Sequence, residues 1–191
     1  ALRAAAVPVI AITGRPKGWS ERFAREWPVA AIVAENGAVA LIAEGNSVRI
    51  EYAQDVVTIA QNAERLARAA ARVLREVPGA TLARDSAGRI TDIATDHAEF
   101  ATLNDADIAR VVAVMHDEGT HATVSSIHVN GWLGDHDKLS GARRMVHDLF
   151  GRDLDAERER WIYVGDSTSD QAMFAAFMLS VGVASLQPLA A

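Results

Sequence analysis

The fold predicted for this chain is decided by one stretch, RWIYVGDSTSD at residues 160–170. The apolar run from Trp161 to Val164 predicts a buried β-strand that stops at Gly165, with a helix beginning near Ser169. Asp166 and Asp170 then follow the carboxyl end of a strand, which is the edge where open α/β sheets bind ligands. We expect both carboxylates to point into one small space.

Such a carboxylate pair favours a hard cation. Magnesium prefers one or two carboxylates and keeps its other positions for water and substrate phosphate, so Mg2+ is the predicted cofactor. The alternative is purely structural: Asp166 ends a strand and Asp170 caps a helix.

Composition bounds the class of protein. The chain has 191 residues, of which 50% are hydrophobic, enough for one domain or for a core with a smaller insert. No apolar run reaches the length of a membrane span and the start lacks a signal-peptide pattern, so a cytoplasmic protein with no membrane partner is expected. Without cysteine, only carboxylates and the six histidines could bind a metal. The net charge of −6 argues against nucleic acid, and oligomeric state is left open.

A second buried parallel strand is predicted from Val7 to Ile12. It is followed by Thr13-Gly14-Arg15-Pro16, which offers a hydroxyl, a close backbone amide and a guanidinium to a phosphate. Ser20 is predicted to cap the next helix. The aromatic stripe of that helix is interpreted as packing rather than as a ligand cage: Trp19, Phe23 and Trp27.

An inserted α/β unit is predicted from about Val39 to Trp132. A third strand at 29–33 and a turn at 35–38, whose Asn36-Gly37 pair favours positive φ, precede it. The pattern then changes to antiparallel strands, a helix over 61–77, a hairpin and a helix capped by Thr102 or Asn104.

The last strand of the insert is predicted to run from His121 to Val129. One of its sides is unusually polar for a core and carries Ser126, His128 and, just beyond, Asn130. These three are candidate substrate contacts in a cleft, although a solvent-exposed sheet face explains them equally well.

Lys138 is predicted to begin the helix that follows the insert. A lysine in the first turn opposes the helix dipole, so it needs a partner such as Asp135, Asp137 or a bound anion. With Thr13 and the aspartate pair, Lys138 completes a set of groups that suits a phosphoryl group.

At this point the chain resembles the haloacid dehalogenase-like (HAD) superfamily. The resemblance covers nearly the whole chain and is carried by an ordered set of motifs: Thr13-Gly14-Arg15-Pro16, Asn36-Gly37-Ala38, Lys138 and Gly165-Asp166-Ser167-Thr168-Ser169-Asp170. With an α/β insert between the second and third motifs, it is similar to the branch of sucrose-phosphate, trehalose-phosphate and mannosyl-3-phosphoglycerate phosphatases. The implied fold is α/β, a Rossmann-like parallel sheet core at 1–38 and 133–191 with an inserted α/β cap at 39–132.

The resemblance also implies roles. Thr13 and the Gly14 amide would bind the transferring phosphoryl group, and Lys138 would neutralise its charge. Asp166 and Asp170 would hold Mg2+. Further substrate contacts are predicted at Arg15, Asn36, Ser126, His128, Asn130 and Ser167.

The family's first motif, an Asp-x-Asp that supplies nucleophile and general acid, is not present in this chain, and 9–13 cannot replace it. The expected function is Mg2+-dependent hydrolysis of a small phosphorylated metabolite through an aspartyl-phosphate, with the nucleophile outside this chain and the chain alone inactive. Either a fragment of an enzyme or a degenerate relative fits. The alternative is a non-catalytic module that binds a phosphorylated metabolite. A response-regulator-like domain ranks lowest, because it leaves the insert unexplained.

Overall fold

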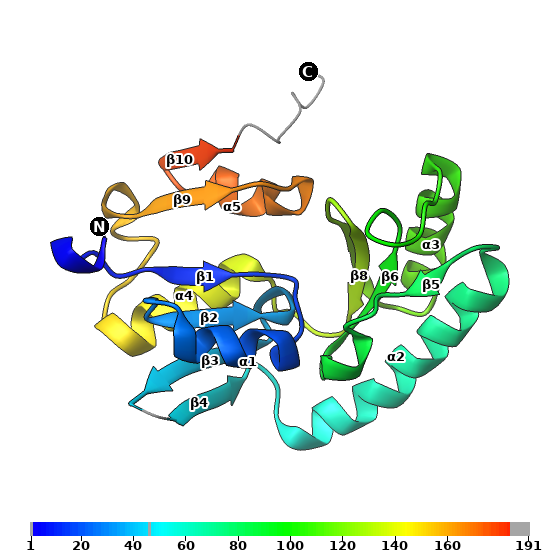
Figure 1. Cartoon of the computed structure of the whole chain (residues 1–191), viewed down its shortest axis with the longest axis horizontal. Helices are drawn as coiled ribbons and strands as arrows, with labels where there is room; N and C mark the ends of the chain where they lie inside the picture. Colours follow the sequence, from blue (N-terminus) through cyan, green and yellow to red (C-terminus); the bar gives the residue numbers. More distant parts are fainter. Residues whose placement is uncertain (1, 46, 184–191) are drawn as a thin grey trace.

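The computed structural model describes residues 2–45 and 47–183. It has two parts, a core that contains both ends of the described chain and a cap inserted between core elements (Figure 1). The core sheet has four strands, which are in spatial order β1 (Ile10–Ile12), β2 (Ala31–Ala34), β3 (Val39–Glu44) and β4 (Ser47–Tyr52).

The predicted parallel pair at the start of the chain is confirmed. β1 and β2 are parallel and are joined by helix α1 (Lys17–Glu26), which packs its small Ala24 against this sheet. The predicted cap of this helix is wrong. Its N-cap is Pro16, and Ser20 lies inside the helix with no exposed surface.

The insert begins later than the sequence pattern suggested. β3 and β4 are antiparallel, as expected, but β3 pairs with β2 and so both strands extend the core sheet. Antiparallel alternation reveals how two strands pair but not which sheet they join, so the predicted boundary at Val39 placed this hairpin in the wrong part. The inserted elements start after Tyr52.

The cap is a four-stranded antiparallel sheet covered on one face by two helices (Figure 1). Its strands are in spatial order β5 (Thr81–Leu82), β6 (Asp92–Asp96), β8 (His128–Trp132) and β7 (His121–Val124). Helix α2 (Val56–Glu76) is capped by Asp55 and α3 (Asp105–Asp117) by Asn104, as predicted for the second. Val73, Met115 and Val129 form the centre of the apolar layer between helices and sheet.

The single strand predicted from His121 to Val129 is in fact a hairpin. β7 ends at Val124 and β8 begins at His128, and the two are antiparallel. Ser126 therefore lies in the connecting turn, exposed, and not on a strand beside His128 and Asn130. The turn was not recognised in the sequence because Ser125, Ser126 and Ile127 continue the two-residue alternation of the flanking strands.

After the cap, helix α4 (Lys138–Phe150) returns to the core, and β9 (Ile162–Gly165) and β10 (Leu179–Gly182) form a separate parallel pair. Between them lie η5 (Thr168–Asp170) and helix α5 (Gln171–Ala176). The prediction of a strand here is confirmed, but its burial is wrong: Ile162 is 65% and Val164 59% exposed. Within the described residues β9 pairs only with β10, and β1 pairs only with β2. β1 and β9 thus each have one edge without a partner strand among residues 2–45 and 47–183 (Figure 1).

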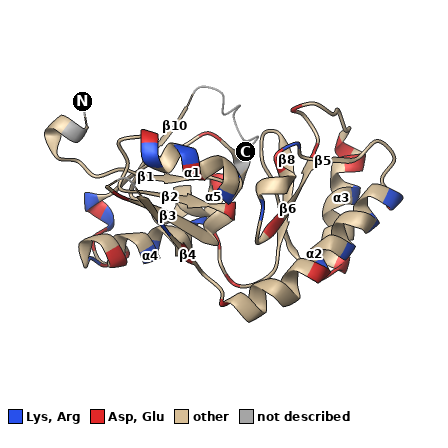
Figure 2. Cartoon of the chain, turned by 60° about the horizontal axis from the view of Figure 1, so that its bottom comes forward, with Lys and Arg blue, Asp and Glu red and all other residues tan. Residues whose placement is uncertain are grey.

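Charged residues of both signs are interspersed along α2 and α3 (Figure 2). Several pair with one another, as Arg72 does with Glu76 and Glu118. None of the described helices has the length and apolarity that a membrane span needs.

Candidate active site

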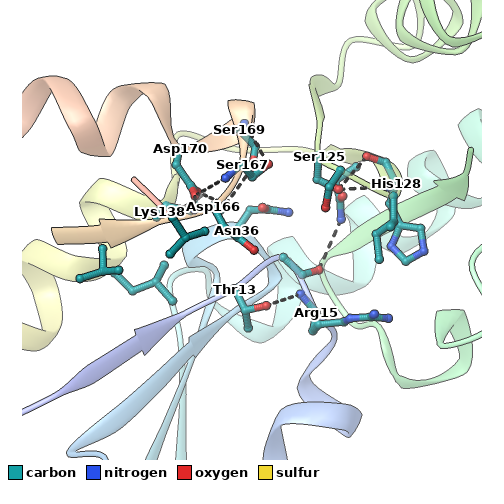
Figure 3. A pocket seen from close by; sticks show the side chains of 18 of the residues that line it. Thr13, Arg15, Asn36, Ser125, His128, Lys138, Asp166, Ser167, Ser169 and Asp170 are labelled. Atoms are coloured by element: carbon teal, nitrogen blue, oxygen red, sulfur yellow. Dashed lines mark hydrogen bonds and ion pairs between the residues drawn. The ribbon is translucent and has the colours of Figure 1, made fainter. Parts of the chain in front are cut away.

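A cavity of about 530 Å3 lies between core and cap, at the carboxyl ends of β1 and β9. All the residues predicted for the site line it: Thr13, Gly14, Arg15, Asn36, Ser126, His128, Asn130, Lys138, Asp166, Ser167 and Asp170. Figure 3 shows Thr13 and Lys138 on the core side and His128 on the cap side. The fold thus brings together residues as far apart in sequence as Thr13 and Asp170.

The loop after β1 places the Thr13 side chain. The Thr13 backbone N–H donates to the Val33 carbonyl of β2 at 2.8 Å, which continues the strand pairing. Its hydroxyl oxygen accepts a hydrogen bond from the Arg15 N–H at 3.0 Å. Because that oxygen already serves as acceptor, the hydroxyl hydrogen is left to donate into the cavity.

Lys138 is held by the loop that follows β9. Its Nζ donates to Asp170 Oδ1 at 2.6 Å and to Ser169 Oγ at 2.9 Å. The partners expected from sequence, Asp135 and Asp137, are therefore not the ones found, since Asp137 instead caps α4 through the Ser140 N–H. The lysine side chain reaches across to the loop, which is why its place in the first turn is tolerated.

The two predicted metal ligands differ in environment. Asp170 is buried, and its Oδ2 accepts hydrogen bonds from the Asp166 and Ser167 N–H groups, both at 3.2 Å. Asp170 is the N-cap residue of α5, as the purely structural alternative predicted, but its side chain makes no capping hydrogen bond to that helix. Asp166 is exposed. Burial and the neighbouring Asp170 raise the pKa of Tyr163, which therefore stays a protonated phenol beside these carboxylates.

The donor chemistry here fits magnesium. Two carboxylates border the cavity, one of them open to solvent, and hydroxyls of Ser167 and Ser169 lie nearby. Among the described residues no group of three or more His, Cys, Asp and Glu side chains could enclose a metal ion. A site of two carboxylates completed by water and phosphate oxygens is the arrangement that Mg2+ accepts.

The cap side of the cavity carries His128. This side chain is buried, and its Nε2 lies 3.0 Å from Glu99 Oε2. Glu99 also pairs with Arg15 of the core loop at 2.9 Å. Burial, with Arg89 nearby, lowers the pKa of His128. His128 and Asn130 are both buried, so the alternative of a solvent-exposed sheet face is wrong for them.

Sequence analysis missed a buried acid at the junction of core and cap. Glu35 has no exposed surface and a φ of 47°. Its carboxylate accepts hydrogen bonds from the Lys17 N–H of the core at 2.8 Å and from the Thr91 N–H and hydroxyl of the cap, both at 2.6 Å. The Ile90 N–H also donates to it at 3.1 Å. Glu35 thus joins the two parts beside the cavity.

A second missed group is the pair of Arg89 and Asp92. Arg89 Nη1 donates to both Asp92 carboxylate oxygens at 2.9 Å, and the two side chains are 2% and 0% exposed. Burial raises the pKa of Asp92 to about 7, while Arg89 opposes that shift. The signal for this pair was present in the sequence, because Asp92 is a charged residue within residues 90–94, which form the second strand of the predicted hairpin after the helix over 61–77.

Comparisons with known proteins locate the fold. No protein-family model and no curated protein matches the chain. Solved structures do match it, each with 14% sequence identity. A Thermoplasma acidophilum protein has a TM-score of 0.72, and the match covers 98% of this chain and 75% of that protein. A Synechocystis sucrose-phosphatase solved with sucrose and phosphate has a TM-score of 0.67, with 97% of this chain and 73% of the other covered. A HAD subclass IIB sugar phosphatase has a TM-score of 0.60, with 94% of this chain and 75% of the other covered.

At these identities the likeness concerns the path of the chain. It agrees with a core that contains parallel strands and with the inserted α/β cap. The chain therefore has the HAD-like fold, a Rossmann-like α/β core with a cap domain.

Proposed function

We propose that this chain forms the phosphate- and metal-binding part of a Mg2+-dependent phosphatase for a small phosphorylated metabolite, of the sugar phosphate or phosphoglycerate type. One observation carries the proposal: Lys138, fixed by Asp170 at 2.6 Å, lines the same cavity as the Thr13 hydroxyl. An ammonium and a hydroxyl donor around one space, beside carboxylates, match the charge that develops on a transferring phosphoryl group.

We call Thr13, Gly14 and Lys138 the phosphate cradle, and each of these residues has a distinct role. Thr13 donates its hydroxyl hydrogen to a phosphoryl oxygen, and the Gly14 N–H supports it. Lys138 offsets negative charge on the phosphoryl group. Asp166 and Asp170 would hold Mg2+, which would supply positive charge opposite the phosphoryl oxygens. In the reaction a carboxylate attacks phosphorus and the P–O ester bond breaks, so that the metabolite leaves as an alcohol once its oxygen takes a proton from a general acid outside this chain. Water then hydrolyses the acyl-phosphate, which releases inorganic phosphate and restores the carboxylate.

We assign the attacking carboxylate to a segment outside this chain. The support is the free edges of β1 and β9, which border the same cavity through Ile12 and Val164. A parallel strand between these edges would end beside Thr13 and Asp166, where a nucleophile is needed. The alternative function is a non-catalytic module that binds a phosphorylated metabolite with the same cradle.

Binding and turnover separate the proposal from this alternative. Isothermal titration of the 191-residue chain with Mg2+ and then with inorganic phosphate should show both bind, and p-nitrophenyl phosphate should not be hydrolysed. A longer form of the protein that supplies the strand should hydrolyse phosphate monoesters with Mg2+. Phosphate binding without turnover in the longer form would favour the binding module, and no phosphate binding in either would reject both.

The two lysines of the chain provide a matched control. Lys138→Met should weaken phosphate binding at least about tenfold, which corresponds to roughly 1.4 kcal/mol. Lys17→Met should leave it unchanged, since the Lys17 side chain pairs with Glu21 on the outer face of α1. Equal losses in both variants would mean that net charge, and not the cradle, attracts phosphate.

Discrimination between substrates is assigned to the cap. Thr13, Lys138 and the aspartates address only phosphate and metal, which every substrate shares. His128 and Asn130 face the cavity from the other side and can contact a leaving group. In the longer form, His128→Ala should lower kcat/KM on the preferred metabolite at least about tenfold and barely change it on a small aryl phosphate. Parallel losses on both would place His128 in folding or catalysis.

A further inference from the structure

The cap grips the backbone of the core loop that carries Thr13. The carbonyl oxygen of Gly14 accepts a hydrogen bond from Arg89 Nη1 at 3.0 Å and another from Asn130 Nδ2 at 3.4 Å. Arg89 lies between η3 (Ser86–Gly88) and β6, and Asn130 lies on β8, so both donors belong to the cap. Two cap side chains thus converge on one peptide group of the core.

That peptide group is also the one that orients Thr13. The Gly14 carbonyl and the Arg15 N–H belong to the same planar peptide unit, so fixing the direction of one fixes the direction of the other. The Arg15 N–H donates to the Thr13 hydroxyl oxygen at 3.0 Å. The cap therefore holds one end of a rigid plane whose other end holds the catalytic hydroxyl.

The contacts between the cap and this loop are buried, and they include a charged pair. The Arg89 and Asp92 side chains are 2% and 0% exposed, and Asp92 also accepts hydrogen bonds from Asn36 at 3.2 Å and Asn130 at 3.3 Å. Asn36 comes from the core and lines the cavity. If the cap separated from the core, Arg89 would lose its hydrogen bond to the Gly14 carbonyl, and Asp92 would lose its hydrogen bond from Asn36. Unpaired buried polar groups are costly, so this set of contacts exists only when cap and core are together.

We propose that Arg89 is a positioning residue: seated on Asp92, it orients the Gly14–Arg15 peptide, and with it the Thr13 hydroxyl, toward a phosphoryl group while the cap rests on the core. It adds to the hold of the core, whose Glu35 and Asn36 N–H groups donate to the Arg15 and Thr13 carbonyls at 3.1 and 3.2 Å. The phosphate cradle is then complete in the closed arrangement and incomplete without the cap. This inference rests on the proposed function for the identity of the ligand, but not for the coupling between Arg89 and the Arg15 amide.

The coupling is tested by amide hydrogen exchange and by phosphate binding in the 191-residue chain. Arg89→Met should raise the exchange rate of the Arg15 amide at least about tenfold and weaken inorganic phosphate binding by a similar factor, while Mg2+ affinity stays within about twofold. Mg2+ is the internal reference, because Asp166 and Asp170 lie on another loop. Arg89→Lys, which keeps one charged donor, should recover part of both losses.

Two further variants keep the test decisive. Arg84→Met removes the same charge from the cap, but Arg84 stacks on Phe100 and should change neither readout. The double variant Arg89→Met with Asp92→Leu removes the charge pair together, so it should fold even if Arg89→Met alone does not, and it should still lose Arg15 protection.

The outcomes separate this inference from the proposed function. Unchanged Arg15 exchange in the folded double variant would overturn the inference, whatever happens to phosphate. Equal loss of Mg2+ and phosphate binding would overturn it as well, since it would show general loosening. A wild-type chain that binds no phosphate, yet loses Arg15 protection in the variants, would refute the proposed function and leave the coupling intact.

Discussion

The two sides of the candidate site are built in opposite ways. On the cap side, Glu35, Arg89 and Asp92 are buried and bonded to partners from both core and cap. On the other side, the facing edges of β1 and β9 have no partner strand in the part of the chain that the structure describes, and Ile162 and Val164 are mostly exposed. One side is a closed polar junction and the other an open apolar one.

This difference indicates which contacts the described chain satisfies by itself. Buried carboxylates and guanidinium groups are tolerated only when hydrogen bonds and opposite charges surround them. The buried charged groups at the cap junction have such partners. Free strand edges and exposed branched side chains are tolerated poorly, because such edges pair readily with another strand. The closed side should therefore be sensitive to single substitutions and the open side insensitive, and the predictions below test this contrast.

The largest effect is expected at Glu35. Glu35→Ala removes the acceptor that the Lys17, Ile90 and Thr91 N–H groups share, and Thr91 is buried. We expect the free energy of unfolding to fall by about 4 kcal/mol, since each buried donor left unpaired costs roughly 1–3 kcal/mol and some gain water. Urea denaturation followed by tryptophan fluorescence measures it.

Glu44→Ala is the matched control. Glu44 ends β3, is exposed, and pairs only with the exposed Arg49 among the described residues. Its loss should cost less than about 0.5 kcal/mol. Similar costs for Glu35 and Glu44 would show that water already reaches the junction, and the contrast between the two sides would fail.

A smaller effect is expected at His136, in the segment that leads from the cap back to α4. The residue is buried, and neither ring nitrogen has a hydrogen-bond partner among the described residues. Burial, with His121 and Arg144 nearby, lowers its pKa from 6.5 to about 4. The unfolded chain takes up this proton below pH 6.5 and the folded chain only near pH 4, so the contribution of His136 to the free energy of unfolding should fall by about 3 kcal/mol as the pH falls through that interval.

The measurement is the free energy of unfolding from pH 4 to 7.5. His136→Gln should lack this contribution, because an amide does not titrate, so its stability relative to the wild type should rise by about 3 kcal/mol toward pH 4. The opposite contribution of Asp92, whose pKa is raised to about 7, is common to both proteins and cancels in the difference. His147→Gln on the exposed face of α4 should keep the wild-type curve. A wild-type curve that overlays the His136→Gln curve would mean that the imidazole is solvated, and hence that the junction is not closed here.

How much of this could be predicted from the sequence depends on the range of the signal. The site motifs are short and local: Thr13-Gly14-Arg15 follows one strand and Asp166 follows another, so their place at the carboxyl ends of strands could be predicted from strand periodicity. All the predicted site residues do line one cavity. Their chemical roles remain predictions.

What could not be predicted is which partner each polar group meets. Glu35 is a turn residue in the sequence, and only the docking of the cap turns it into a buried acceptor. The partner of Lys138 is Asp170, 32 residues away in the sequence. The helix dipole predicted only that Lys138 needs an acidic partner, and the nearby Asp135 and Asp137 were the obvious candidates. The hairpin of β7 and β8 was missed because its turn keeps the strand period. The apolar composition of β9 likewise predicted a buried strand. A strand is buried only where another element packs against it, and the sequence pattern of the strand does not show whether one does.

The smallest effect is expected on the open side. Ile162 is 65% exposed, so Ile162→Thr keeps the β-branched shape that suits a strand and should change stability by less than about 0.5 kcal/mol. The control is Ile32→Thr on β2, where the side chain is 1% exposed and a hydroxyl would be buried, at a cost of about 2–4 kcal/mol. Equal costs at both positions in the 191-residue chain would show that the β9 face is covered. In the longer form proposed above, a strand between β1 and β9 would cover Ile162, and the cost of Ile162→Thr should rise toward that of Ile32→Thr. If it stays below about 0.5 kcal/mol there, the strand does not occupy this position, and the nucleophile must reach Thr13 by another route.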